Sequence, residues 1–145
     1  MIREQIAAGG RALPWVDPRA YAEEMIEREI IAREVALASG LQVILDRGIP
    51  DVVGFLRVTG LAVPPHIDQA ARRLRYHPRV LLAPWWDTIY TGDSERRQSP
   101  AVAEATEQMM RETYRDYGYE LIELPRAPVT ERVAFVRREL EQTCA

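Results

Sequence analysis

The chain has 145 residues, of which 47% are hydrophobic and 28% charged, a balance that excludes a disordered or fibrous protein and fits a single domain over residues 1–145. Its 19 basic and 22 acidic residues give a net charge of -3 and are mixed along the sequence, so no nucleic-acid partner is expected. All the basic residues are arginine, which excludes any mechanism that requires a lysine within this sequence.

The apolar runs are too short to form a membrane segment. The longest, such as residues 80–86, fall far below the roughly 20 residues that span a bilayer. No charged leader precedes an apolar core at the N-terminus. The only cysteine, Cys144, has no local partner for a disulfide or a metal cage. We therefore expect a cytoplasmic protein with no membrane contact.

The first part of the chain alternates helix patterns with a strand pattern. Residues 1–9 are predicted to form a helix, because Ile2 and Ile6 are four positions apart and glycine follows. A long helix is predicted to begin after its N-cap, Asp17, and to end at residues 39–40. Residues 41–48 are mostly aliphatic and end in a charged pair and a glycine, which predicts a buried parallel strand.

The rest of the chain continues the alternation. The remaining predicted elements are a helix over 49–58, a helix from Pro64-Pro65, a buried strand over 79–84, a polar stretch over 88–100, a helix over 101–117 closed by Gly118, a strand over 119–124 and a helix from about 130. Alternating strands and helices favour parallel pairing, hence a three-layer α/β fold. Three strands are fewer than the five or so that such a sheet usually has, so we expect the sheet to be incomplete.

The residues just after the first predicted strand are the first candidates for a site, because ligands of open α/β sheets bind at the carboxyl ends of strands. Asp46 at this position is suited to reach Mg²⁺, and the adjacent Arg47 is suited to clamp a phosphoryl group. A purely structural interpretation is equally open: Asp46 caps the helix that starts near residue 49, and Arg47 pairs with Asp51.

The polar stretch after the second predicted strand contains two adjacent arginines, Arg96 and Arg97. They are placed to swing over a nucleotide and neutralise charge on its phosphates, although a solvated surface pair is the commoner role for such residues. Trp85 and Trp86 at the strand end are suited to stack on a base, and equally to fill a core or an interface.

The whole pattern resembles a family, the small bacterial predicted ATPases of the AAA type that are built like P-loop nucleotide kinases. The resemblance runs over nearly the entire chain. The residues that carry it are Ile2-Arg3-Glu4-Gln5, Ala7-Ala8-Gly9-Gly10, Ala12-Leu13-Pro14-Trp15, Leu45-Asp46-Arg47-Gly48-Ile49-Pro50-Asp51-Val52, Tyr76-His77, Ala83-Pro84-Trp85, Ile89-Tyr90, Glu95-Arg96-Arg97-Gln98, Tyr117-Gly118-Tyr119, Leu124-Pro125-Arg126 and Glu131-Arg132-Val133.

This resemblance implies roles for the candidate residues. Asp46 would stand at the Walker B-like position beside the metal, and Arg47 and Asp51 would line the acceptor side. Arg96 and Arg97 would lie in a lid-like segment, about residues 88–100, and act in catalysis. The implied cofactors are ATP and Mg²⁺, and the implied partner is a small-molecule phosphoryl acceptor.

The sequence departs from the family at its front. Family members begin with a strand, a G-x-x-x-x-G-K-[ST] loop and a helix, whereas this sequence contains no such loop and no lysine. We therefore expect an incomplete P-loop kinase-like parallel sheet without its first strand, P-loop and first helix. In folds of this class the absent strand lies between the strands at Val43 and Val80, so two edges would be left unpaired.

Three functions follow as expectations. The first is an ATP-binding ATPase or small-molecule kinase-like enzyme that begins upstream of Met1, so that the chain as given is inactive and binds no ATP by itself. The second is a non-catalytic interaction protein derived from the same fold, with a homodimer covering the exposed sheet edges. The third is an isolated acceptor-binding module that uses Arg47 and Asp51.

Overall fold

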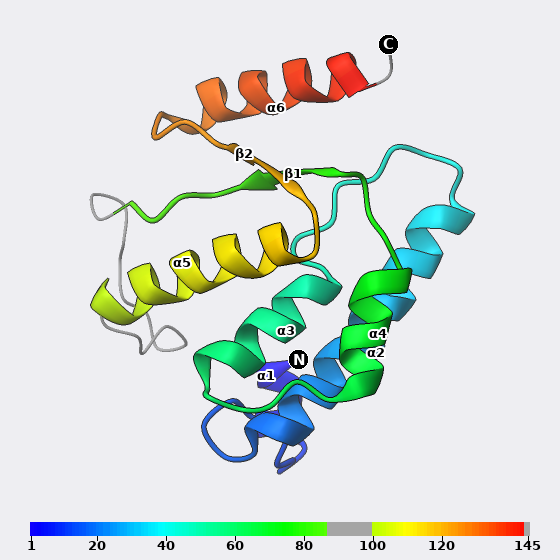
Figure 1. Ribbon diagram of the computed structural model, residues 1–145, viewed down its shortest axis with the longest axis vertical. Coiled ribbons are helices and arrows are strands. Elements are labelled where there is room, and N and C mark those ends of the chain that lie inside the picture. The colour runs from blue at the N-terminus through cyan, green and yellow to red at the C-terminus, as the bar shows by residue number, and fades with distance from the viewer. Residues whose placement is uncertain (87–99, 144–145) are drawn as a thin grey trace. The chain divides into compact units, whose positions relative to one another are not determined.

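The computed structural model of the chain describes residues 1–86 and 100–143 (Figure 1). It contains six helices and two strands within these residues and divides into two compact units, Met1–Tyr76 and His77–Ala145. Mixed helices and parallel strands confirm the α/β class at this coarse level. The single-domain organisation stays a prediction. None of the helices in the described part of the chain is long and apolar enough to cross a membrane.

The first unit consists of four helices: α1 (Ile2–Ala7), α2 (Pro18–Ala38), α3 (Ile49–Val58) and α4 (Pro65–Arg73). The N-cap predicted for α2 is confirmed, since an Asp17 carboxylate oxygen accepts a hydrogen bond of 3.0 Å from the Ala20 amide. Helices α3 and α4 both begin with proline in their first turn, where the missing N–H costs nothing. The four helices begin close to the predicted positions, and α1, α2 and α3 also end close to theirs.

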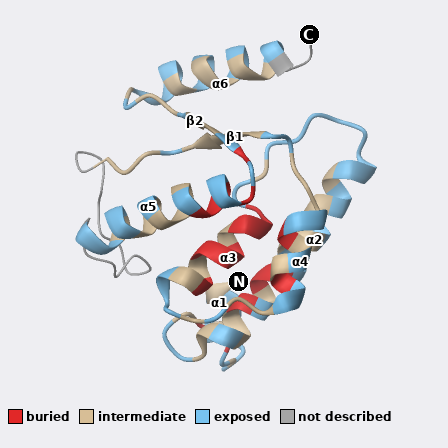
Figure 2. Ribbon diagram, in the orientation of Figure 1, coloured by how far each residue is buried: buried red, intermediate tan, exposed pale blue. Residues whose placement is uncertain are grey.

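Helix α3 forms the centre of the first unit, with α2 and α4 packed against it. Figure 2 shows the buried residues of this unit concentrated on α3. These buried residues are Ile49, Val52, Val53 and Leu56 of α3, with Ala22, Met25 and Ile26 of α2 and Ile67 and Ala71 of α4. Because α3 itself is well packed, the position of its first turn is fixed.

The second unit contains a parallel pair of strands with a helix on either side (Figure 1). Its elements are β1 (Arg79–Leu82), α5 (Pro100–Asp116), β2 (Glu120–Glu123) and α6 (Val129–Thr143). Arg79 of β1 pairs in register with Glu120 of β2. Gly118, with a φ of +76°, ends α5 as predicted, because its left-handed conformation suits glycine. The predicted parallel pairing of these two strands is confirmed, although β1 is half-buried rather than buried.

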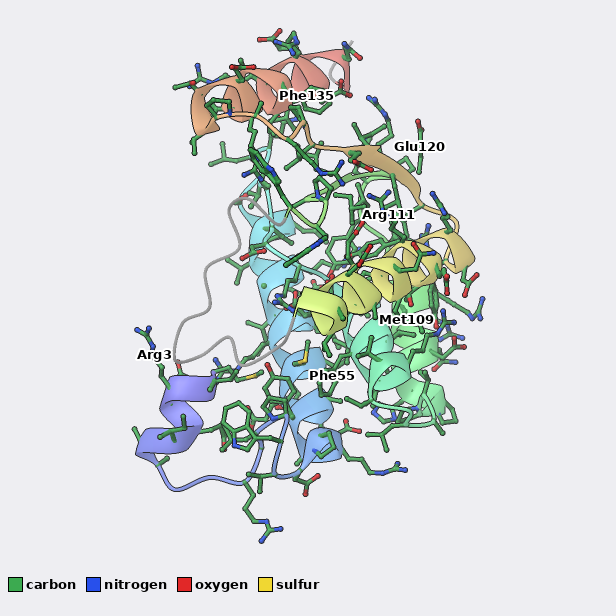
Figure 3. The ribbon with its side chains drawn as sticks, turned by 90° about the vertical axis from the view of Figure 1, so that its left-hand side faces the viewer. Arg3, Phe55, Met109, Arg111, Glu120 and Phe135 are labelled. Carbon is green, nitrogen blue, oxygen red and sulfur yellow. The ribbon has the colours of Figure 1, made fainter. Side chains whose placement is uncertain are left out.

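Ion pairs join the helices of this unit to its strands. Arg79 of β1 lies 2.5 Å from Glu139 of α6, and Arg111 of α5 lies 2.5 Å from Glu123 of β2. Figure 3 shows Arg111 on the side of α5 that faces the strands. Tyr114 and Tyr119 meet edge to face with ring centroids 5.5 Å apart, next to the glycine turn.

The strand predicted over residues 41–48 is wrong. These residues connect α2 to α3 without regular structure, and Leu41 and Ile44 are 76% and 59% exposed. A strand exists only when a neighbouring backbone accepts and donates its hydrogen bonds, and no described segment pairs with this one. The aliphatic pattern reports what the side chains favour and not whether a partner strand is present.

Candidate functional site

The predicted site residues Asp46, Arg47 and Asp51 lie at the turn that leads into α3. Asp46 and Arg47 are exposed, whereas Gly48 and the next two residues are buried (Figure 2). These three residues, close together in the sequence, lie in one short segment, and their functional roles stay predictions. The structure places them after an irregular connection and not at the carboxyl end of a strand.

Asp51 is the residue that caps α3. The Gly48 amide donates a hydrogen bond of 2.9 Å to Asp51 Oδ2, and the Asp51 amide donates one of 2.9 Å to the Gly48 carbonyl oxygen. This reciprocal arrangement satisfies an amide that α3 itself leaves without a partner. The structural interpretation that assigned the cap to Asp46 is corrected, because the cap is the carboxylate inside the first turn.

Tyr76 is a member of this site to which the sequence analysis assigned no role, although it lies in one of the segments that carry the family resemblance. Its hydroxyl oxygen accepts a hydrogen bond of 3.1 Å from the Ile49 amide. A Cβ atom added to Gly48 would lie 3.0 Å from Tyr76 Cε2, so the ring packs directly on the glycine. The residues are 27 positions apart, and no local pattern predicts their contact.

Arg47 has an unusual backbone conformation, with a φ of +82° in the left-handed region. For a residue with a Cβ atom this conformation costs about 1–2 kcal/mol and persists only where the surroundings impose it. Here the surroundings are Asp51 and Tyr76, which hold the amides of the next two residues. The sequence gives no sign of this, because arginine is not a residue that favours left-handed turns.

Helix α2 contributes two titratable groups near Arg47. Burial raises the pKa of Glu29, the charges of Asp51 and Asp46 raise it further, and Arg47 opposes the shift. Burial also raises the pKa of Tyr21, again opposed by Arg47. The Tyr21 ring meets Phe55 of α3 edge to face at 5.1 Å. The sequence analysis names no candidate residue on α2, so Glu29 is a group that only the structure brings to the turn.

The group of charges around the α3 turn is therefore mixed. The Glu29 carboxyl group feels the positive charge of Arg47 and the negative charges of Asp51 and Asp46. A guanidinium donates hydrogen bonds and carboxylates accept them, so the turn offers both kinds of group within one short segment. The two amides at the front of α3 are occupied by Asp51 and Tyr76, so they do not form a cradle for phosphate.

The residues around the turn do not by themselves fit Mg²⁺ or the phosphates of ATP. Among the described residues, no group of three or more His, Cys, Asp or Glu side chains is arranged to hold a metal ion. Asp46 offers one exposed carboxylate, while Mg²⁺ in nucleotide sites also needs substrate phosphates held by a loop. The metal role of Asp46 stays a prediction.

The other predicted residues belong to the second half of the chain. Arg96 and Arg97, with most of the lid-like segment, lie outside the described residues. Trp85 follows β1, and its carbonyl oxygen accepts a hydrogen bond of 3.1 Å from Arg126 Nε, which follows β2. The segments after two parallel strands are thus joined at their carboxyl ends, the usual ligand-binding edge of an α/β sheet.

Comparison with known proteins assigns a family. The family model described as an AAA domain matches residues 1–132. No curated protein matches the sequence, and no solved structure matches it either. The match covers the α3 turn, the parallel strands and the segment of Arg96 and Arg97, and so all the residues predicted to form the site. The chain belongs to the AAA domain family.

Proposed function

We propose that these residues form part of an ATP-dependent enzyme, an ATPase or a small-molecule kinase-like protein of the P-loop class. The observation that carries this proposal is the AAA domain match over residues 1–132. The α3 turn, with Arg47 and Asp51, is the acceptor side. Arg96 and Arg97 act on the phosphates, since arginines that neutralise developing charge are a recurrent part of phosphoryl transfer.

The 145 residues do not supply the phosphate-binding part of this enzyme. They contain no lysine and no G-x-x-x-x-G-K-[ST] loop, whose backbone amides and lysine hold the phosphates of ATP. We infer that the chain as given neither binds nor hydrolyses ATP at a useful rate, and that Mg-ATP is used only when such a loop is supplied.

The test compares the chain as given with a longer chain. The genomic DNA upstream of the Met1 codon is read in frame for a strand followed by the loop motif, over about one βαβ unit or 30 residues. Both chains are then assayed for Mg-ATP hydrolysis and for ATP binding by calorimetry. We expect no activity from the 145 residues and turnover from the longer chain. Hydrolysis by the 145 residues alone would contradict the proposal.

Variants of the longer chain test the catalytic role of Arg96 and Arg97. Arg96→Gln and Arg97→Gln should each lower kcat by roughly 10²-fold or more, as loss of a charge-stabilising donor does in other enzymes. Arg115→Gln on α5 is the matched control: Arg115 is exposed and lies outside the proposed site. If all three changes lower kcat equally, Arg96 and Arg97 do not have the proposed catalytic role.

A second candidate function is association without ATP, through a homodimer or another partner. The specific observation in its favour is the exposed apolar segment of residues 41–44, which includes Leu41, Val43 and Ile44. If the upstream DNA holds no loop motif, this candidate replaces the enzyme.

A further inference from the structure

Tyr76 lies against the turn that contains Arg47, although it is distant in sequence. Its hydroxyl oxygen accepts a hydrogen bond of 3.1 Å from the Ile49 amide. Its ring covers Gly48 so closely that an added Cβ would lie 3.0 Å from Cε2, 3.1 Å from Cζ and 3.3 Å from Oη. The φ of Gly48 is -169°, which any residue adopts, so the ring is what requires glycine here.

Tyr76 is itself held in place by the helices of its unit. The Arg33 side chain of α2 donates a hydrogen bond of 3.1 Å from Nε to the carbonyl oxygen of Arg75, the residue before it. Helix α4 packs on α3 and brings the chain back to the start of α3. The tyrosine is therefore a fixed support and not a loose surface side chain.

The turn is held from two directions. Asp51 accepts from the Gly48 amide at 2.9 Å, and Tyr76 accepts from the Ile49 amide at 3.1 Å. These two bonds fix the peptide groups that directly follow Arg47, whose φ of +82° lies in the left-handed region. If either bond is lost, the turn is free to relax toward ordinary conformations.

We propose that Tyr76 is a positioning residue for Arg47 and thereby for the acceptor side of the enzyme. The proposal rests on the proposed function for the role of Arg47, while the positioning itself is a property of the turn. Tyr76 acts through the Ile49 amide and the surface of Gly48, and does not contact the reacting groups.

The first test uses Tyr76→Phe, which keeps the ring and removes only the hydroxyl. In the 145-residue chain, hydrogen exchange of the Ile49 amide by NMR should accelerate about five- to tenfold relative to the α3 amides of Val53 and Leu56, the size expected for one lost hydrogen bond. The Cα chemical shift of Arg47 should move away from its left-handed value. Tyr119→Phe in the second unit is the matched control and should change neither signal.

A second test uses the contact of the ring with Gly48. Gly48→Ala should shift the Arg47 signals in the wild-type background, because the new methyl group meets the ring at 3.0 Å. In a Tyr76→Ala background the same change should shift them far less, and this non-additivity is the signature of a direct contact. Additive effects, or an unchanged Ile49 exchange rate in Tyr76→Phe, would overturn the proposal.

These readouts need no nucleotide, so they separate the two proposals. If the Arg47 turn responds to Tyr76→Phe, the positioning role is supported whatever the enzyme does. If Arg47→Gln then leaves ATP turnover of the longer chain unchanged, the acceptor role of Arg47 fails while the positioning role stands.

Discussion

Glu29 illustrates at the residue scale how the packing of α2 on α3 alters a single carboxyl group. It is half-buried, and burial is the largest cause of its raised pKa, followed by the negative charge of Asp51. A raised pKa in the folded state means that the charged form is disfavoured there relative to the unfolded chain. The neutral form therefore favours folding below the ordinary value of 4.5, and this benefit is lost as the pH rises through the folded pKa.

We therefore expect Glu29→Gln to stabilise the first unit at pH 7, since glutamine keeps the shape and has no charge to bury. The gain should shrink as the pH is lowered and vanish below about pH 4.5, where the wild-type carboxyl is protonated in both states. Thermal unfolding followed by circular dichroism from pH 3.5 to 8 measures this. Glu27→Gln, at an exposed position of the same helix, is the control. A pH-independent difference between Glu29→Gln and wild type would contradict the assignment.

The α3 turn shows how far residue-level prediction from the sequence reaches. Asp46, Arg47 and Asp51 were singled out because charged residues follow an aliphatic run; they lie where the chain enters α3, and their functional roles stay predictions. The capping role of Asp51, the left-handed backbone of Arg47 and the contact of Tyr76 were not predictable. Each depends on a backbone geometry or a distant residue that no local pattern specifies.

At the scale of elements, Arg111 joins α5 to β2. It forms ion pairs with Glu107, one turn earlier on α5, and with Glu123 of β2. Burial by itself lowers the pKa of Arg111, but the hydrogen bonds that it donates to Glu123 and Glu107, with the charges of these two carboxylates, more than reverse this, so the net shift is upward. A guanidinium shared by two carboxylates and largely shielded from water contributes more than an exposed pair.

Arg111→Met should lower the free energy of unfolding by about 1 kcal/mol, because the partly shielded Glu107 carboxylate and the exposed Glu123 carboxylate both lose their cation. Arg115→Met on the same helix is the matched control and should change it by about 0.5 kcal/mol or less, since Arg115 is exposed. Urea denaturation of both variants measures the difference. Equal losses would show that α5 is held to β2 by its apolar contacts alone.

The success of prediction differed between helices and strands for a physical reason. A helix forms its hydrogen bonds within one segment, so caps and spacing at Asp17, Pro65 and Gly118 predicted its ends. A strand needs a second segment. The aliphatic residues of β1 have β2 beside them, whereas those of 41–45 have no partner in the described chain and form an exposed connection.

At the scale of the whole molecule, the exposed apolar segment 41–44 favours association between chains in water. Leu41 and Ile44 are 76% and 59% exposed, and Val43 between them is 45% exposed. Strand-forming residues that are exposed outside a sheet favour pairing with other chains. Concentration-dependent association of the 145-residue chain is the expected consequence.

The double variant Leu41→Lys/Ile44→Lys should reduce this association and cost less than about 0.5 kcal/mol of stability, because both side chains are exposed. Light scattering after size exclusion, over a range of protein concentrations, measures the mass. Val129→Lys/Val133→Lys on α6 adds the same charge at exposed apolar positions elsewhere and is the control. If both double variants reduce association equally, net charge and not the 41–44 segment governs it.

The sequence by itself determined the helices, the cap of α2 at Asp17, the two strands that pair in parallel, the absence of a lysine and of a P-loop motif, and the resemblance to AAA-type proteins, which the AAA domain match supports. These follow from local spacing and residue identity. Only the tertiary structure decided that residues 41–45 form no strand with another described segment, that Asp51 caps α3 and that Tyr76 supports the turn of Arg47. Each of these depends on which distant segments meet, and spacing along one chain does not encode that.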